Sequence, residues 1–243
     1  MDTVPATVAR PFSLPDAAAR ATRESTLFHR SPYAVRAVSR PATDFTADFY
    51  LTAWRGEDLW VALGDFAGHG LKSAIQMAMV QEELERILSS CDGMRPAEVV
   101  AELNDSMRGV MPSNRFATLV VGYARPDGAI DIVNAGHSAP LIVRRSGAVE
   151  MIDSHGPVVG LIPVAGWREE VVRLDRHDRL VLYTDGIEEA TSREDHEFGV
   201  SRLVEAVMRA DPLHPLDSVM QSVDGFTSGA RHDDQSLLIL TKL

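Results

Sequence analysis

Four aspartates are spread along the chain, and each lies at the end of a short apolar run beside a turn residue. They are Asp48, Asp65, Asp185 and Asp233. A carboxylate at a buried strand end is unfavourable unless a partner neutralises its charge. If these carboxylates converge in the fold, they would form a site for hard divalent cations, which prefer oxygen ligands.

The segment 64–70 (Gly-Asp-Phe-Ala-Gly-His-Gly) places Asp65 between an apolar strand and a long helix. Its glycines permit the sharp turn that this junction needs. The backbone carbonyl of Phe66 is a further oxygen ligand suited to a hard cation, and the start of the helix near Gly70 favours an anion. Two alternatives stay open: a plain glycine-rich turn, and a nucleotide loop, although the segment lacks the Gly-x-x-x-x-Gly-Lys pattern of that loop.

The other acidic segments are weaker signals when each is taken singly. Asp185 follows an apolar run and precedes Gly186, a pattern that ordinary hairpins also show. Asp233 and Asp234 are adjacent like charges, which repel each other, and either an exposed loop or a metal site would tolerate them.

Hydrophobic periodicity predicts a single α+β sandwich domain. Short Val-, Tyr- and Phe-rich runs between turn residues indicate strands, and the period becomes helical after residue 70. Antiparallel strands with helix pairs inserted between them favour packed layers, in which the first and last strands pair with distant partners. The predicted strands are 33–39, 48–54, 59–65, 116–123, 130–134, 141–144, 149–152, 171–174, 179–184 and 236–241, and the predicted helices are 70–90, 96–110, 199–210 and 215–226.

Residues 1–30 are predicted to be a lead-in to a main domain that spans residues 31–243. Three prolines in the first 15 residues and little periodicity indicate a flexible start. Asp16, directly after a proline, favours a short Ala-rich helix that ends at about Phe28. This helix is interpreted either as a regulatory or dimerising element or as an arm packed on the domain.

The composition excludes several classes of protein. With 24 Lys and Arg against 35 Asp and Glu, the net charge of −11 argues against binding to nucleic acid or to an anionic membrane. Cys91 is the only cysteine, so intrachain disulfides and Cys-based metal sites are excluded. No apolar stretch approaches the ~20 residues of a membrane span, and no signal pattern is present. We therefore expect a cytoplasmic protein.

Six segments, in their order along the chain, resemble the motifs of the PPM (protein phosphatase 2C-like) metal-dependent serine/threonine phosphatases. The nearest branch is the bacterial one typified by stage II sporulation protein E and the RsbU-like regulators of sigma factors. Each motif is modest alone, but the ordered set is specific and extends from Tyr33 to Leu243. The segments are 46–50 (Thr-Ala-Asp-Phe-Tyr), 64–70, 116–119 (Phe-Ala-Thr-Leu), 134–140 (Asn-Ala-Gly-His-Ser-Ala-Pro), 183–186 (Tyr-Thr-Asp-Gly) and 233–236 (Asp-Asp-Gln-Ser).

The resemblance implies a four-layer αββα sandwich, in which two antiparallel sheets are flanked by helix pairs, with a phosphatase domain over residues 31–243. It implies hydrolysis of phosphoserine or phosphothreonine with two Mn²⁺ or Mg²⁺ ions and no covalent phosphoenzyme. The usual substrates of this branch are phosphorylated anti-anti-sigma (STAS-domain) proteins in partner-switching pathways. A homodimer is left open.

The same resemblance assigns roles to individual residues. Asp65 is expected to bridge both metal ions, with the Phe66 carbonyl on one of them. Asp48 is expected to bind the first ion, and Asp185 and Asp233 to complete the shell of the second. These four aspartates are the implied catalytic residues.

The first motif departs from the Gly-Gly-Asp-Phe-Tyr-Asp that is usual in this branch. Thr46 and Ala47 replace glycines, and Leu51 removes a second acid. Because the first acid is kept, an active enzyme is favoured. The departures support one alternative, a catalytically weak binding module that sequesters a regulatory partner. A metal-dependent nuclease or cyclase is disfavoured by the acidic charge balance and the lack of basic stretches.

Two histidines, His69 and His137, lie inside matched motifs. A general-acid role near the leaving group is one interpretation of His69. The favoured interpretation makes both residues structural, with hydrogen bonds to the turns around them. The phosphate-binding arginine of some eukaryotic relatives has no clear match beyond Arg40, and Asp234 is an acidic neighbour of the ligands whose role is left open.

Overall fold

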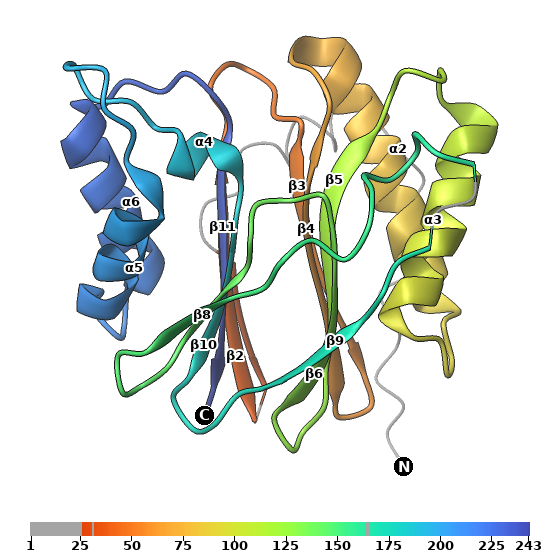
Figure 1. Cartoon of the computed structure of the whole chain (residues 1–243), viewed down its shortest axis with the longest axis horizontal. Coiled ribbons are helices and arrows are strands. Elements are labelled where there is room, and N and C mark those ends of the chain that lie inside the picture. Colours follow the sequence, from red (N-terminus) through yellow and green to blue (C-terminus); the bar gives the residue numbers. More distant parts are fainter. Residues whose placement is uncertain (1–25, 31, 164–165) are drawn as a thin grey trace.

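Two antiparallel sheets pack face to face, and helices cover the outer face of each (Figure 1). The computed structural model describes residues 26–30, 32–163 and 166–243. The predicted four-layer αββα sandwich is confirmed.

One sheet has six strands and the other has five. In spatial order, the six-stranded sheet contains β1 (Thr26–Arg30), β2 (Tyr33–Arg40), β11 (Gln235–Lys242), β10 (Arg179–Tyr183), β7 (Leu141–Val143) and β8 (Val149–Met151). The five-stranded sheet contains β3 (Asp48–Arg55), β4 (Asp58–Phe66), β5 (Ala117–Ala124), β6 (Ala129–Ala135) and β9 (Glu170–Arg173). The helices are α2 (Gly70–Ser89), α3 (Pro96–Val110), α4 (Asp185–Glu188), α5 (Gly199–Arg209) and α6 (Pro215–Thr227).

Three hydrophobic cores lie between the four layers. The first joins α2 and α3 to the five-stranded sheet and includes Leu84 and Leu103. The second fills the space between the sheets, with residues such as Leu63 and Leu182. The third joins α5 and α6 to the six-stranded sheet and includes Leu203. Both faces of each sheet are therefore buried, which explains the nearly continuous apolar runs of the central strands.

The strands and helices predicted from periodicity are all present within one residue of their predicted bounds. β2 pairs with β11, as expected for elements at the two ends of the domain. The predicted run of strands over 116–152 is divided between the sheets, because β6 pairs with β5 whereas β7 pairs with β10. Within the described residues, no helix combines the length and the apolarity needed to cross a membrane.

The prediction that a helix extends to about Phe28 is wrong for its last residues. Residues Thr26–Arg30 form β1, which pairs antiparallel with β2 at the edge of the six-stranded sheet. This segment, Thr-Leu-Phe-His-Arg, contains no alanine, and its pairing with β2 places it in the sheet. The rest of that prediction lies outside the described residues. The sheet begins at Thr26, before the predicted boundary at residue 31.

Candidate active site

Asp48 and Asp65 face each other at one end of the β3–β4 pair. The neighbouring pair carries a backbone hydrogen bond from Phe66 N to Ala47 O of 3.1 Å. Asp48 and Asp65 therefore form a non-hydrogen-bonded pair, the type in which side chains lie closer together. Asp48 is only 4% exposed. Like charges placed opposite each other destabilise a sheet unless they are compensated.

The segments that carry Asp185 and Asp233 meet that pair from the six-stranded sheet. β10 leads directly into the short helix α4, which begins at Asp185 where the sequence suggested only a turn. Gly186 lies so close to the next segment that a Cβ atom there would be 2.0 Å from the Asp234 carbonyl oxygen and 3.2 Å from Asp233 Cβ. The fold thus brings the four predicted carboxylates to one place from both sheets.

Burial and mutual repulsion raise the pKa values of these carboxyls. Burial, and then the charge of Asp65, raises the pKa of Asp48 well above its ordinary value. Burial, followed by the charges of Asp185, Asp233 and Asp234, raises the pKa of Asp65 to about 7. Burial and Asp233 raise the pKa of Asp185. No Lys or Arg of the described residues is among the main influences on these three groups, so their charge is left without a protein partner.

Buried hydroxyl groups orient Asp48. Thr184 Oγ1 donates to Asp48 Oδ2 at 2.9 Å, and the same hydroxyl oxygen accepts the Ser236 N–H at 2.9 Å. A hydrogen bond from the Ser236 side chain also acts to lower the pKa of Asp48, against the larger effect of burial. Neither residue was predicted to belong to the site. The available signal is position, since Thr184 and Ser236 lie inside the matched motifs 183–186 and 233–236.

The donor set fits hard divalent cations. Four carboxylates and the Phe66 carbonyl offer only oxygen atoms, which Mg²⁺ and Mn²⁺ prefer. Across residues 26–30, 32–163 and 166–243, no three Asp, Glu, His or Cys side chains already enclose a single ion. Mg²⁺ is usually bound by one or two carboxylates together with several waters.

The two histidines of the matched motifs differ in their surroundings. His137 is buried, its Nδ1 lies 2.7 Å from Thr118 Oγ1, and burial lowers its pKa to about 4. Its backbone N–H donates to Asn134 Oδ1 at 2.8 Å, so the structural interpretation of His137 is supported. His69 is exposed at the N-terminal end of α2 and makes no side-chain capping hydrogen bond. The structural role of His69 stays a prediction.

Arg40 forms an ion pair with an acid of α6, whereas Arg115 supports the loop after Asp65. Arg40 Nη1 pairs with Asp224 Oδ2 on α6 at 2.9 Å. Arg115 Nη1 donates to the Ala67 carbonyl at 2.8 Å and lies 2.8 Å from where a Cβ atom on Gly68 would be. Arg115 was not predicted, although it directly precedes the matched motif at 116–119.

The departures in the first motif are accommodated by the fold. Thr46 and Ala47 are buried, and neither is among the described non-glycine residues with positive φ. Thr46 Oγ1 accepts the Asp48 N–H at 3.0 Å and so supports the acid that follows. Leu51 packs in the core beneath α2 and α3. The glycines and the second acid of the related sequences are thus not needed for the backbone path seen here.

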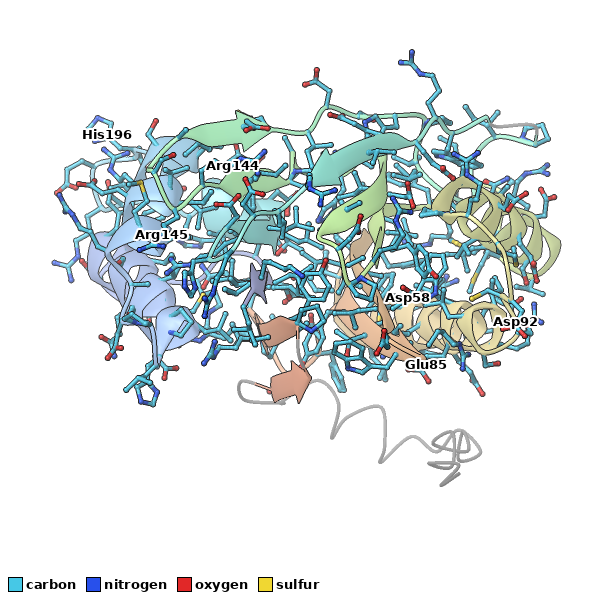
Figure 2. The ribbon with its side chains drawn as sticks, turned by 90° about the horizontal axis from the view of Figure 1, so that it is seen from below. Asp58, Glu85, Asp92, Arg144, Arg145 and His196 are labelled. Carbon is cyan, nitrogen blue, oxygen red and sulfur yellow. The ribbon has the colours of Figure 1, made fainter. Side chains whose placement is uncertain are left out.

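A cavity of about 660 Å³ lies at the opposite end of the β3–β4 pair, where Arg55 is the register partner of Asp58. Figure 2 shows this end, with Asp58 and Asp92 on the side of α2 and α3. Two of its acidic groups have partners, since Tyr123 Oη donates to Asp58 at 2.6 Å and Arg125 pairs with Asp131. Arginines line this cavity together with its carboxylates, whereas no Lys or Arg is among the main influences on Asp65 within the described residues.

Comparison with known proteins agrees with the fold and the motifs. Residues 55–242 match the family model described as stage II sporulation protein E (SpoIIE), so the segment with Asp48 precedes the match. Protein IcfG of Synechocystis sp. is 27% identical over 237 residues, which cover 84% of this chain and 37% of that protein. Phosphoserine phosphatase RsbU of Bacillus subtilis is 22% identical over 214 residues, which cover 86% of this chain and 63% of that protein. The chain thus spans less than two thirds of either relative.

The solved SiaA-PP2C domain of Pseudomonas aeruginosa has the same fold. The alignment of the two structures has a TM-score of 0.76 at 16% sequence identity, and it covers 86% of this chain and 85% of that domain. The SpoIIE match extends over most of the chain, including the loop of Asp65 and the segments of Asp185 and Asp233. This chain belongs to the SpoIIE family of PPM-type protein phosphatases.

Proposed function

We propose that this chain is a metal-dependent phosphoserine/phosphothreonine protein phosphatase. Asp48, Asp65, Asp185 and Asp233, with the Phe66 carbonyl, would hold two divalent cations, either Mn²⁺ or Mg²⁺. The observation that carries this proposal is the gathering of four carboxylates at one edge of the sheets. Within the described residues, no Lys or Arg is among the main influences on the pKa values of Asp48, Asp65 and Asp185. Such a cluster is unfavourable by itself and favourable around cations.

When bound, two divalent cations would supply the chemistry that activates a water molecule for attack on phosphorus and offsets negative charge on the phosphate oxygens. The chain's own groups would position the reactants. Thr184 holds one oxygen of Asp48, which leaves the other oxygen for a ligand role. The first turn of α2 contains no acidic residue, so its N–H groups can attract the phosphate.

The described structure favours direct hydrolysis over a covalent phosphoenzyme on cysteine. Cys91 is buried and lines the cavity at the far end of the sheet, away from the acidic cluster. Burial also raises the pKa of its thiol, which disfavours the nucleophilic thiolate. The lone cysteine is therefore assigned a packing role.

The substrate we propose is a phosphorylated anti-anti-sigma regulator of the STAS type, dephosphorylated in the cytoplasm as part of a partner-switching pathway. Membership of the SpoIIE family and similarity to RsbU, which is named a phosphoserine phosphatase, support this choice. The other function considered is a catalytically weak binding module with the same fold. It rests on the altered first motif, at Thr46, Ala47 and Leu51.

Phosphate release from a phosphoserine-bearing STAS protein in the presence of Mn²⁺ tests the proposal. Asp65→Asn is the inactive comparison, and Asp44→Asn is the matched control because Asp44 is exposed in the loop before β3. We expect wild type and Asp44→Asn to release phosphate and Asp65→Asn to release none. If wild type shows no turnover of either this substrate or p-nitrophenyl phosphate with Mn²⁺ or Mg²⁺, the binding-module function replaces the enzyme.

A further inference from the structure

The Asp234 carboxylate is already occupied by backbone groups of the loop that joins β2 to β3. Its Oδ1 accepts the Ala42 N–H at 2.8 Å, and its Oδ2 accepts the Ala47 N–H at 2.7 Å. Both side-chain oxygens of Asp234 therefore accept backbone N–H groups. A carboxylate used in this way is held in place by the loop and holds the loop in return.

The hydrogen bond to Ala47 has a consequence for Phe66. In a regular antiparallel pair, two opposed residues exchange both of their backbone hydrogen bonds. Phe66 N donates to Ala47 O at 3.1 Å, but Ala47 N donates to Asp234 rather than back to Phe66 O. The Phe66 carbonyl, the backbone oxygen predicted to bind a metal ion, is thus released from its partner in the sheet.

The main chain of Asp234 contacts the remaining acidic segments. Its N–H donates to Asp233 Oδ1 at 2.8 Å and so fixes one oxygen of the predicted ligand beside it. Its carbonyl oxygen lies 3.4 Å from Thr184 Oγ1 and packs against Gly186, which leaves no room for a Cβ atom there. Thr184 and Gly186 flank Asp185. Asp234 therefore contacts the segments that carry Asp48, Asp185 and Asp233, and it acts on Phe66 through Ala47.

We propose that Asp234 is a positioning residue of the metal site and not a metal ligand. It accepts the Ala47 N–H in place of the Phe66 carbonyl, which leaves that carbonyl available to an ion. It also fixes the loop before Asp48 against the segment of Asp233. This inference rests on the proposed function, because it presumes that metal ions bind at the cluster. The charge of Asp234 alone would not indicate this role.

Isothermal titration of the metal-free protein with Mn²⁺, in the absence of substrate, tests this role. Asp234→Asn keeps the side-chain shape but replaces one acceptor with an NH₂ group, and Asp234→Glu keeps the charge but displaces the carboxylate. Both should bind Mn²⁺ about 10- to 100-fold more weakly than wild type, as is typical when a group that orients a ligand is lost. Asp44→Asn, in the same loop, should stay within about two-fold of wild type.

Wild-type affinity in Asp234→Glu would overturn the positioning role, because charge alone would then suffice. Wild-type affinity in both variants would overturn it as well, while leaving the phosphatase proposal intact. Failure of wild type itself to bind Mn²⁺ would instead overturn the proposed function, and this inference with it. The three results are read from one titration series and are distinguishable.

Amide exchange on the wild-type protein gives a second test that needs no variant. If Asp234 stays on the loop when metal binds, the Ala42 and Ala47 N–H groups should exchange no faster after addition of Mg²⁺. Faster exchange at both amides would mean that the carboxylate has left them for the ion, and the positioning role would be wrong. This measurement decides the matter even if the Asp234 variants fail to fold.

Discussion

Asp48 and Asp65 are register partners on adjacent strands, so two carboxylates lie opposite each other in the sheet. The charge of Asp65 helps to raise the pKa of Asp48, and burial is the larger cause. Within the described part of the chain, the groups that most influence these two carboxyls include other carboxylates and hydroxyls but no cation.

Asp65→Asn should abolish turnover and leave the fold intact. The amide keeps the shape of the side chain but lacks the charge with which the carboxylate would hold cations, so we expect a fall in kcat of more than about 100-fold, beyond the effect of losing an orienting group. Circular dichroism and gel filtration check the fold. A variant with near wild-type kcat would remove Asp65 from the mechanism.

The metal-free protein should lose stability as the pH rises from about 4 to about 7. The ordinary pKa of the Asp65 carboxyl is 3.8, and the fold raises this pKa to about 7. Between these values the folded state binds more protons than the unfolded state, so the free energy of unfolding falls as pH rises. Asp65→Asn lacks this contribution and should be more stable than wild type at pH 8, with a smaller difference at pH 4.

The comparison with Asp65→Asn is needed because His137 acts in the opposite direction. Burial lowers the pKa of His137 from 6.5 to about 4, so its contribution to stability is lost as pH falls through that range. His137 is common to both proteins, and its effect cancels in their difference. A difference in melting temperature that is the same at pH 4 and pH 8 would contradict the raised pKa of Asp65.

Chelation should stop turnover, and added Mn²⁺ should restore it and raise the melting temperature. Cations that bind the folded state alone stabilise it by about 2.7 kcal/mol at 100 times Kd. For a domain of this size each kcal/mol corresponds to a shift of roughly 2–4 °C. Differential scanning calorimetry with EDTA and with saturating Mn²⁺ measures the effect, and an unchanged melting temperature would count against metal binding at the cluster.

Thr184→Val should weaken both the fold and the site. The change removes the donor to Asp48 Oδ2 and the acceptor of the Ser236 N–H, both of which are buried. An unsatisfied buried polar group lowers the free energy of unfolding by about 1–3 kcal/mol, and Mn²⁺ affinity should fall about 10- to 100-fold. Thr184→Ser keeps the hydroxyl and should recover most of the affinity; if it does not, the hydrogen bond is not the cause.

Gly186→Ala should disrupt the junction between Asp185 and Asp233. The new Cβ would meet the Asp234 carbonyl oxygen at 2.0 Å, so one of the two segments must move. A displacement on the order of 1 Å can reduce catalysis about 100-fold. Gly225→Ala is the matched control, because a Cβ on this exposed glycine of α6 meets nothing within 4 Å. Equal kcat in the two variants would show that the close approach is unimportant.

The fold was largely predictable because its elements have strong local signals. α3 begins at a proline and carries a regular apolar face, and β3 and β4 are apolar runs joined by a turn at Gly56. The short helix α4 was missed because its four residues are too few to show a helical period. β1 was missed because its pairing with β2, rather than its own composition, determines its conformation.

The acidic residues of the site were predictable as types, but their supporting contacts were not. Asp48 and Thr184 are 136 positions apart in the chain, and Asp234 and Ala47 are 187 apart. Hydrogen bonds of this separation depend on how the two sheets pack, which periodicity does not specify. Arg115 was missed for the same reason, since only the fold places its guanidinium beside Ala67.

The most direct test of the central claim is a crystal soaked in Mn²⁺, with anomalous scattering used to locate the ions. We predict two Mn²⁺ peaks among Asp48, Asp65, Asp185 and Asp233, with Asp65 and the Phe66 carbonyl in contact and the Asp234 oxygens still on the loop. Absence of peaks at this cluster, or peaks confined to other carboxylates, would contradict the assignment of a two-metal phosphatase site.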